Sequence, residues 1–235
     1  MTKNTISIGG FNKFSLIDYP GKTCAIIFTQ GCNFRCPYCH NPELVLPHLF
    51  EPPIPVSEVL SFLEKRKGLL EAVELTGGEP TIQEDLPKTI KQIKKMGYLI
   101  KIDSNGSNPD IIKRLIDEQL VDYFAMDIKA PLENYSEACG TIVDTNKISE
   151  SINIIMQYAP DYEFRTTAIK KIHTKDSFRK IGLLTKGAKQ YYLQNAHYDK
   201  TVSEKFKNEK AFSKEEMHAF CEEIKKNVKH CYLRI

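Results

Sequence analysis

The sequence contains no tryptophan and no long apolar run, and its positive and negative charges nearly cancel. The longest uninterrupted apolar run, Cys24 to Phe28, falls far short of the roughly 20 residues that a membrane-spanning helix needs. Lys and Arg number 33 against 30 Asp and Glu, an excess too small to indicate nucleic acid or an anionic membrane as a partner. The first ten residues also lack the basic flank and apolar stretch of a secretory signal. We therefore expect a cytoplasmic protein that binds neither nucleic acid nor a membrane.

The chain has 235 residues, of which 41% are hydrophobic, and this content excludes a disordered chain. Its cysteines are unusual in number and spacing. There are seven of them, and Cys32, Cys36 and Cys39 lie within eight residues. An odd count without a secretory signal argues against a disulfide framework and favours metal or redox chemistry.

Short β-rich runs alternate with helical patterns along the chain. Strands are predicted over 23–29, 72–76, 98–103, 121–128, 162–169 and 190–194, and a further strand over 230–235 could follow. Helices are predicted over 56–63, 86–93, 111–116, 148–155, 178–184 and 213–228.

This alternation predicts an α/β fold with a parallel sheet and outer helices. A doubly wound sheet and an open, three-quarter barrel both satisfy the pattern. We expect a single domain over 1–235, made of a short N-terminal extension (1–22), a core (23–198) and a C-terminal helical segment (199–235).

The loop from Gln30 to Asn41 follows the first predicted strand and carries the spacing CxxxCxxC. Three thiolates on a short bent loop converge on one soft metal centre, and three protein ligands leave a position open for a substrate. A four-iron cluster is the favoured interpretation. A zinc site completed by His40, and reactive or buried structural cysteines, are the alternatives.

With the aromatic Tyr38 before its last cysteine, this loop resembles the signature of the radical S-adenosylmethionine (SAM) enzymes. That resemblance implies a partial (β/α)6 barrel with the cluster loop after the first strand. The runs 9–22 and 29–44 resemble more closely the activating proteins of anaerobic ribonucleoside-triphosphate reductase, which belong to the glycyl-radical-enzyme activases.

The resemblance implies one [4Fe-4S] cluster held by Cys32, Cys36 and Cys39, with SAM beside it. The residues expected to bind SAM are Tyr38, Cys39, His40, Gly77, Gly78, Glu79, Asp127, Ile128, Lys129 and His197, with Arg165 as a further candidate. Asp103 and Ser104 correspond, with Asp127, to a monovalent-cation site beside SAM. Purely structural roles compete with each assignment: a Gly-Gly turn before a helix, an Asx-type turn after the third strand, or a buried ion pair.

The implied reaction is the reductive cleavage of SAM to methionine and a 5′-deoxyadenosyl radical, which takes a hydrogen atom from a glycine of a partner enzyme. Anaerobic ribonucleotide reductase is the expected partner, and flavodoxin or ferredoxin the expected electron donor. An activase of pyruvate formate-lyase or of another glycyl-radical enzyme is the nearest alternative. A radical SAM enzyme acting on a small molecule, for example in deazapurine biosynthesis, and a non-catalytic zinc or electron-transfer module are the others.

The remaining cysteines, Cys24, Cys139, Cys221 and Cys231, are widely spaced, and we expect ordinary core or surface thiols. The lysine-rich segment from Lys200 to Lys214 is expected to be a solvated loop, with docking of a partner as the alternative.

Overall fold

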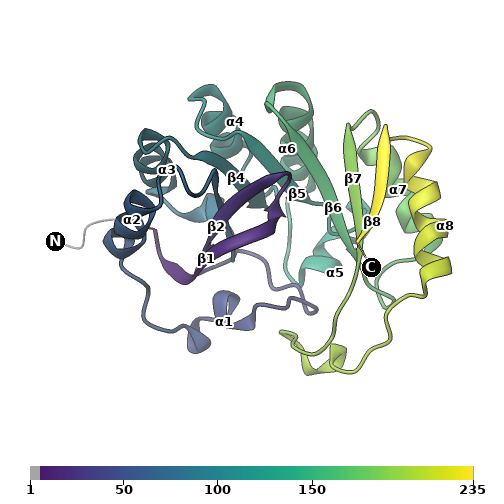
Figure 1. Cartoon of the computed structure of the whole chain (residues 1–235). Helices are drawn as coiled ribbons and strands as arrows, with labels where there is room; N and C mark the ends of the chain where they lie inside the picture. The colour runs from purple at the N-terminus through teal and green to yellow at the C-terminus, as the bar shows by residue number, and fades with distance from the viewer. Residues whose placement is uncertain (1–5, 235) are drawn as a thin grey trace.

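The computed structural model describes residues 6–234 and contains one curved sheet of eight strands (Figure 1). The strands are β1 (Ile8–Tyr19), β2 (Lys22–Thr29), β3 (Ala72–Gly77), β4 (Leu99–Ser104), β5 (Tyr123–Asp127), β6 (Tyr162–Ala168), β7 (Gln190–Asn195) and β8 (His230–Arg234). They lie in the sheet in chain order, and all neighbours from β2 to β8 are parallel. A doubly wound sheet would reverse this order, so the prediction of a partial barrel is confirmed.

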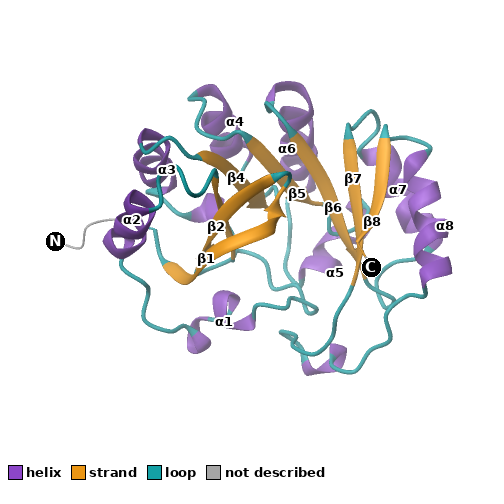
Figure 2. Cartoon of the chain, viewed as in Figure 1, coloured by secondary structure: helices purple, strands orange, loops and turns teal. Residues whose placement is uncertain are grey.

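The longer helices connect the strands and cover the outer face of the sheet, whereas the two shortest, Pro42–Val45 and Tyr135–Cys139, lie at the end where the parallel strands finish (Figure 2). They are α1 (Pro42–Val45), α2 (Val56–Lys65), α3 (Leu86–Lys95), α4 (Pro109–Asp117), α5 (Tyr135–Cys139), α6 (Thr145–Tyr158), α7 (Lys175–Leu184) and α8 (Lys214–Lys225). Short 3-10 turns lie at Pro47–Leu49, Pro80–Ile82, Leu132–Asn134 and Glu204–Phe206. The predicted capping box of the last helix is present, since Ser213 and Glu216 bond each other's backbone N–H groups.

The two faces of the sheet differ in polarity because successive side chains on a strand point to opposite faces. On β3, Val73 and Leu75 pack outward with the helices in the main core, whereas Glu74 points to the interior of the barrel. On β4, Ile100 and Ile102 alternate in the same way with Lys101 and Asp103. The barrel interior therefore carries charged groups, and the apolar core lies between sheet and helices.

The sheet is wider than the six predicted units. The segment expected as an N-terminal extension supplies β1, which pairs antiparallel with β2. β1 was missed because it is an edge strand on which most side chains are partly or fully exposed, so that it lacks a buried periodicity. The optional terminal strand is present as β8, which pairs with β7. β1 and β8 are the two edges of the sheet, so the barrel is open.

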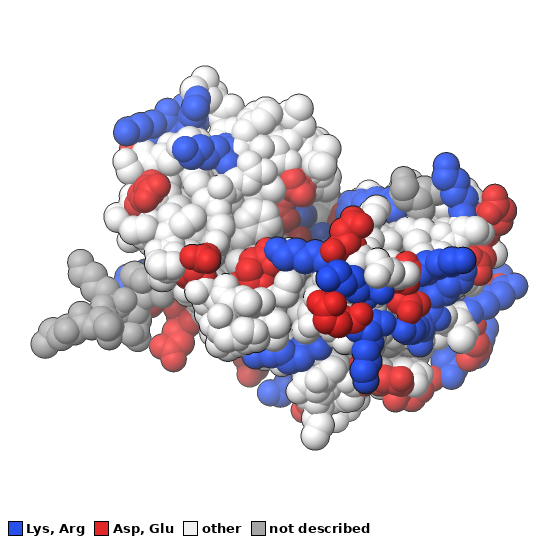
Figure 3. Space-filling model, turned by 90° about the horizontal axis from the view of Figure 1, so that it is seen from below, with Lys and Arg blue, Asp and Glu red and all other residues white. Residues whose placement is uncertain are grey.

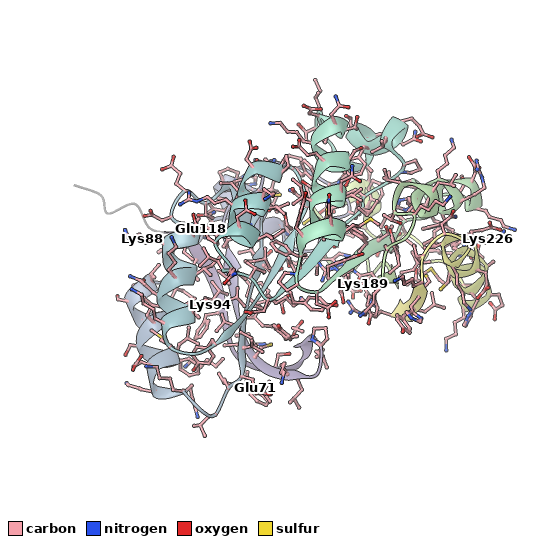
Figure 4. The ribbon with its side chains drawn as sticks, turned by 90° about the horizontal axis from the view of Figure 1, so that it is seen from above. Glu71, Lys88, Lys94, Glu118, Lys189 and Lys226 are labelled. Carbon is pink, nitrogen blue, oxygen red and sulfur yellow. The ribbon has the colours of Figure 1, made fainter. Side chains whose placement is uncertain are left out.

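Surface ion pairs stabilise the end of the barrel from which the parallel strands start. Glu71, just before β3, pairs with Lys22 at 2.9 Å, and Lys94 on α3 pairs with Asp122 at 2.9 Å (Figure 4). The cysteine loop and the turns that follow β3, β4 and β5 lie at the opposite end, where the parallel strands finish. Within residues 6–234, no helix combines the length and apolar character needed to cross a membrane.

Candidate active site at the carboxyl ends of the strands

The cysteine loop leaves the carboxyl end of β2 and is held by its own backbone bonds. Gly31 N donates to Leu44 O at 2.8 Å, and Cys39 N donates to Cys36 O at 3.0 Å. The guanidinium of Arg35 donates to the carbonyls of Cys32 and Phe34, at 2.5 and 2.7 Å. These bonds curl the loop so that all three predicted cluster ligands face one side.

The segment between β7 and α8 lies against this loop. Val202 N donates to Cys39 O at 3.1 Å, and Ser203 N donates to Pro37 O at 2.9 Å. Lys200 pairs with Glu43 at 2.7 Å. The lysine-rich segment is therefore not simply a solvated loop, because it braces the cysteine loop. Figure 3 views this end of the molecule, where charged side chains of both signs gather over the half that carries β7, α7 and α8, while the other half is mostly uncharged.

A cavity of about 240 Å³ opens beside the cysteine loop, at the carboxyl ends of β2 to β7. Nearly all the residues predicted to hold the cluster and SAM line it. These are Cys32, Cys36, Tyr38, Cys39, His40, Gly77, Gly78, Glu79, Asp103, Ser104, Asp127, Lys129 and Arg165.

Two of the predicted residues do not line the cavity. The side chain of Ile128 is fully buried in the core, and its backbone N–H donates to Arg165 O at 2.7 Å. His197 is exposed, and its ring centroid lies 6.5 Å from that of His40. A role for either residue in binding SAM stays a prediction.

Other lining residues were not predicted: Phe34, Asn41, Val45, Thr76, Asn105, Thr167 and Gln194. Asn105 donates to Asn33 Oδ1 at 2.9 Å and lies 3.9 Å from Cys32 Sγ. The sequence could have indicated Asn105 as a site residue, because it directly follows the predicted site residue Ser104. Gln194 donates to Thr167 at 2.9 Å, and both follow the rule that site residues cluster where barrel strands end.

Gly77 and Gly78 join the end of β3 to the cysteine loop without side chains between them. Gly78 N donates to Thr29 O, and Glu79 N donates to Gly31 O, both at 2.8 Å. A Cβ on Gly78 would collide with the carbonyl of Gly31. The absence of side chains therefore lets the two backbone segments meet at the cavity wall.

Glu79 is almost fully buried, and its carboxylate is held within the protein. It accepts bonds from Ser104 Oγ at 2.8 Å, Asn105 N at 2.7 Å and Thr81 Oγ1 at 2.5 Å. Burial raises the pKa of Glu79, although these donors favour the ionised form. Glu79 thus ties the end of β3 to the end of β4.

Arg165 on β6 joins two carboxylates across the barrel interior. Its guanidinium lies 2.9 Å from Asp103 on β4 and 3.0 Å from Asp127 on β5. Lys129 pairs with Asp127 at 2.9 Å, and Lys101 pairs with Asp103 at 2.6 Å. Burial opposes ionisation of both aspartates, but the surrounding cations outweigh it and hold the pKa of each below its ordinary value.

Glu74 on β3 ends this chain of charges, 2.8 Å from Lys101. Burial, reinforced by the negative charge of Asp103, raises the pKa of Glu74 to about 9. Lys101 lies between two carboxylates and neutralises only one of them. Because Asp103 also has Arg165, the proton belongs on Glu74.

The segment from Asp127 to Lys129 is fixed by bonds to its backbone. His173 is buried, and its Nδ1 accepts from Ile169 N at 2.9 Å, so Nε2 carries the proton and donates to Lys129 O at 2.9 Å. Burial lowers the pKa of His173 to about 4, which keeps the ring neutral. Tyr135 adds bonds to Lys129 N and Asp127 O, each 3.3 Å long.

The three cysteines of the loop differ in acidity. Burial raises the pKa of Cys32 to about 12 and also raises that of Cys39. A side-chain hydrogen bond with Cys139 lowers the pKa of Cys36 to about 7, against the effect of burial. The ammonium of Lys129 lowers the pKa of all three thiols and therefore favours the thiolates that bind metals.

Comparison with known proteins identifies the family. The model of the radical SAM superfamily matches residues 26–185, which include the cysteine loop and β3 to β6. The chain belongs to the radical SAM superfamily. A Methanocaldococcus jannaschii protein named after glycyl-radical enzyme activation is 33% identical over 205 residues, covering 85% of this chain and 84% of the relative.

Two further similarities accompany this one. The 7-carboxy-7-deazaguanine synthase of Methanopyrus kandleri is 28% identical over 193 residues, which cover 72% of this chain and 73% of that enzyme. Streptococcus suis SuiB, crystallised with S-adenosylmethionine, superposes with a TM-score of 0.67 at 12% identity, over 87% of this chain and 48% of SuiB. The similarity to SuiB shows the radical SAM fold alone.

Membership of the radical SAM superfamily implies SAM and a [4Fe-4S] cluster as cofactors, and the cavity fits both. Its wall holds three thiols, which would bind a four-iron cluster through three of its irons. His40 Nε2 is buried there without a hydrogen-bond partner, a rare state for a buried polar atom, so it is free to bind a ligand. Burial also lowers the pKa of His40 and keeps its ring neutral.

The fit to single metal ions is different. Within residues 6–234, no three Cys, His, Asp or Glu side chains are grouped to hold one metal ion. The carboxylates of Asp103 and Asp127, expected at a monovalent-cation site, are both bound by Arg165. That cation stays a prediction.

Proposed function

We propose that this radical SAM enzyme activates a glycyl-radical enzyme, and that anaerobic ribonucleoside-triphosphate reductase is the enzyme it activates. The observation that carries the first part is the M. jannaschii relative, because the similarity extends over 85% of this chain. The second part is supported by the runs 9–22 and 29–44, which resemble the activating proteins of that reductase.

When bound, the cluster and SAM supply reductive cleavage of a carbon–sulfur bond and abstraction of a hydrogen atom. Cys32, Cys36 and Cys39 would hold the cluster. The backbone of Gly78 and the charges of Asp127 and Lys129 would position SAM. A low-potential flavodoxin or ferredoxin would supply the electron.

The open barrel is compatible with a polypeptide substrate. The edges β1 and β8 leave the barrel unclosed, and the cavity opens at the ends of the strands. A loop of a large partner could therefore reach the cavity. Glycine has no side chain, so its Cα–H can approach a recessed reaction centre closely.

The decisive experiment is anaerobic. The reconstituted, reduced protein is mixed with SAM and with anaerobic ribonucleotide reductase or pyruvate formate-lyase, each labelled with α-deuterated glycine. We expect deuterium in 5′-deoxyadenosine and a glycyl-radical signal by electron paramagnetic resonance with the ribonucleotide reductase. A signal with pyruvate formate-lyase alone would reassign the partner. Formation of 5′-deoxyadenosine without deuterium or a protein radical would refute activation of these enzymes.

Cys36→Ala should abolish both the SAM cleavage and the protein radical, because the cluster loses a ligand. Cys24→Ser is the matched control. Cys24 is buried on β2 and does not line the cavity, so both signals should persist. SAM cleavage that survives in Cys36→Ala would contradict the ligand assignment.

Synthesis of a small molecule is the second candidate, because the M. kandleri deazaguanine synthase covers 72% of this chain. Incubation of the reduced protein with SAM and an extract of small metabolites, followed by mass spectrometry for 7-carboxy-7-deazaguanine, distinguishes it. We expect none of this product. Its formation would replace the activase proposal.

A further inference from the structure

Cys139, at the end of α5, lies directly against the cysteine loop. Its backbone O accepts from Arg35 N at 2.8 Å, and its fully buried thiol shares a side-chain hydrogen bond with Cys36. Gly140 follows with a φ of 62°, and a Cβ there would collide with the Arg35 carbonyl. The end of α5 is therefore fixed against the loop at the residue next to Cys36.

The other two loop cysteines have different partners. Cys32 Sγ accepts from Phe34 N at 3.4 Å and lies 3.9 Å from Asn105 Nδ2. Cys39 is hydrogen-bonded by the backbone of Asn41. Of the three loop thiols, Cys36 is the one with a thiol partner outside the loop. Cys139 is therefore not the ordinary core thiol that its wide spacing in the sequence predicts.

We propose that Cys36 and Cys139 form a reversible disulfide in the cluster-free protein, which withdraws Cys36 from the cluster site until the bond is reduced. With the cluster bound, iron occupies Cys36 and the disulfide cannot form. The bond would protect an essential ligand from irreversible oxidation while the protein lacks its cluster. This switch does not depend on which enzyme the protein activates.

The oxidation balances with a small disulfide such as oxidised glutathione. The Cys36 thiolate attacks one glutathione sulfur and releases the first glutathione thiolate. The Cys139 thiolate then attacks Cys36 Sγ, closes the protein disulfide and releases the second. Two protein thiols lose two protons and two electrons, and one oxidised glutathione becomes two reduced ones. Cys36 acts first because it lines the cavity, whereas Cys139 is fully buried.

The test maps disulfides in the cluster-free protein. The cluster is removed with a chelator, the protein is incubated with oxidised glutathione without oxygen, and free thiols are blocked with a maleimide before digestion and mass spectrometry. We expect a peptide linked through Cys36 and Cys139. Iron and sulfide uptake should be lost and should return after dithiothreitol. A Cys32–Cys36 or Cys36–Cys39 linkage, or a stable glutathione adduct on Cys36, would overturn the proposal.

Substitution of the second thiol traps the first step. In Cys139→Ser, glutathione should remain on Cys36 as a mixed disulfide. Cys139→Ala repeats the test if the serine variant fails to fold, and the wild-type map decides the matter if both fail. Cys24→Ser is the matched control and should keep the linkage, whose loss there would count against the proposal.

Cys221 on α8 and Cys231 on β8 form a second pair of contacting thiols. A disulfide between them must be distinguished from the one between Cys36 and Cys139. Cys221→Ser removes any linkage between them. The peptide linked through Cys36 and Cys139 should persist in this variant at the wild-type yield. Its disappearance would overturn the assignment.

Discussion

Replacing Arg165 with methionine removes the cation that holds two buried carboxylates together. The guanidinium contacts Asp103 and Asp127 at 2.9 and 3.0 Å, and its side chain is 13% exposed. Breaking a buried ion pair from one side costs about 3–5 kcal/mol, because an uncompensated charge stays behind. Asp127 is 30% exposed, and Lys101 and Lys129 remain, so we expect a loss at the lower end, about 3 kcal/mol.

The size of this loss should depend on pH. In the wild type both aspartates have lowered pKa values, so their stabilisation is complete above the ordinary aspartate pKa of about 4 and is lost as the pH falls below it. Without Arg165 their pKa values rise, and the buried charges become easier to protonate. The deficit of Arg165→Met should therefore be largest at pH 7 and smaller at pH 5.

Urea unfolding of the cluster-free protein, followed by circular dichroism at both pH values, measures this deficit. Adding Asp127→Asn to Arg165→Met removes one of the stranded charges and should recover part of the loss, which a double-mutant cycle quantifies. A deficit below about 1 kcal/mol, or one that is equal at the two pH values, would show that Arg165 is a solvated surface-like group and refute the reasoning.

Three further predictions concern the same end of the barrel. Gly78→Ala should destabilise the protein by about 1–3 kcal/mol and weaken SAM binding in calorimetry, because its Cβ collides with the Gly31 carbonyl; an unchanged melting temperature would contradict this. The free energy of unfolding of Glu74→Gln should increase relative to that of the wild type as the pH rises from 6 to 9. The raised pKa of Glu74 makes the wild type lose at most about 1.4 kcal/mol per pH unit in that range, and parallel urea titration curves would argue against a protonated Glu74. Lys129→Met should slow maleimide labelling of the cluster-free thiols at pH 7 relative to Lys129→Arg, since the ammonium favours their thiolates.

Local patterns were sufficient to predict the repeating units and the position of the cysteine loop. β2 is apolar from Cys24 to Phe28, and the helical stripe of α4 begins at Pro109 after Asn108. Residues at the ends of successive parallel strands meet at one end of a barrel whatever the loops do. For that reason Cys32, Glu79, Asp103 and Asp127 could be placed together from their positions along the chain.

Features that depend on pairing between segments, or on where a chain turns after a strand, could not be predicted from local patterns. β1 is an edge strand whose pairing with β2, more than its own periodicity, defines it. The side chain of Ile128 points into the core, because side chains alternate along an extended segment, and the side chain of His197 is exposed. A role for either residue in binding SAM stays a prediction.

The sequence by itself determined the α/β alternation and the three thiols of the loop, because each depends on neighbours within a few residues. Only the tertiary structure decided the strand order, the bridge of Arg165 between two strands, and the contact of Cys139 with Cys36. The contacts of Arg165 and Cys139 join residues 38 to 103 positions apart, which no local periodicity encodes. The sequence groups three of the seven cysteines in the loop. The fold adds Cys139 to this group, because it brings the end of α5 against the loop.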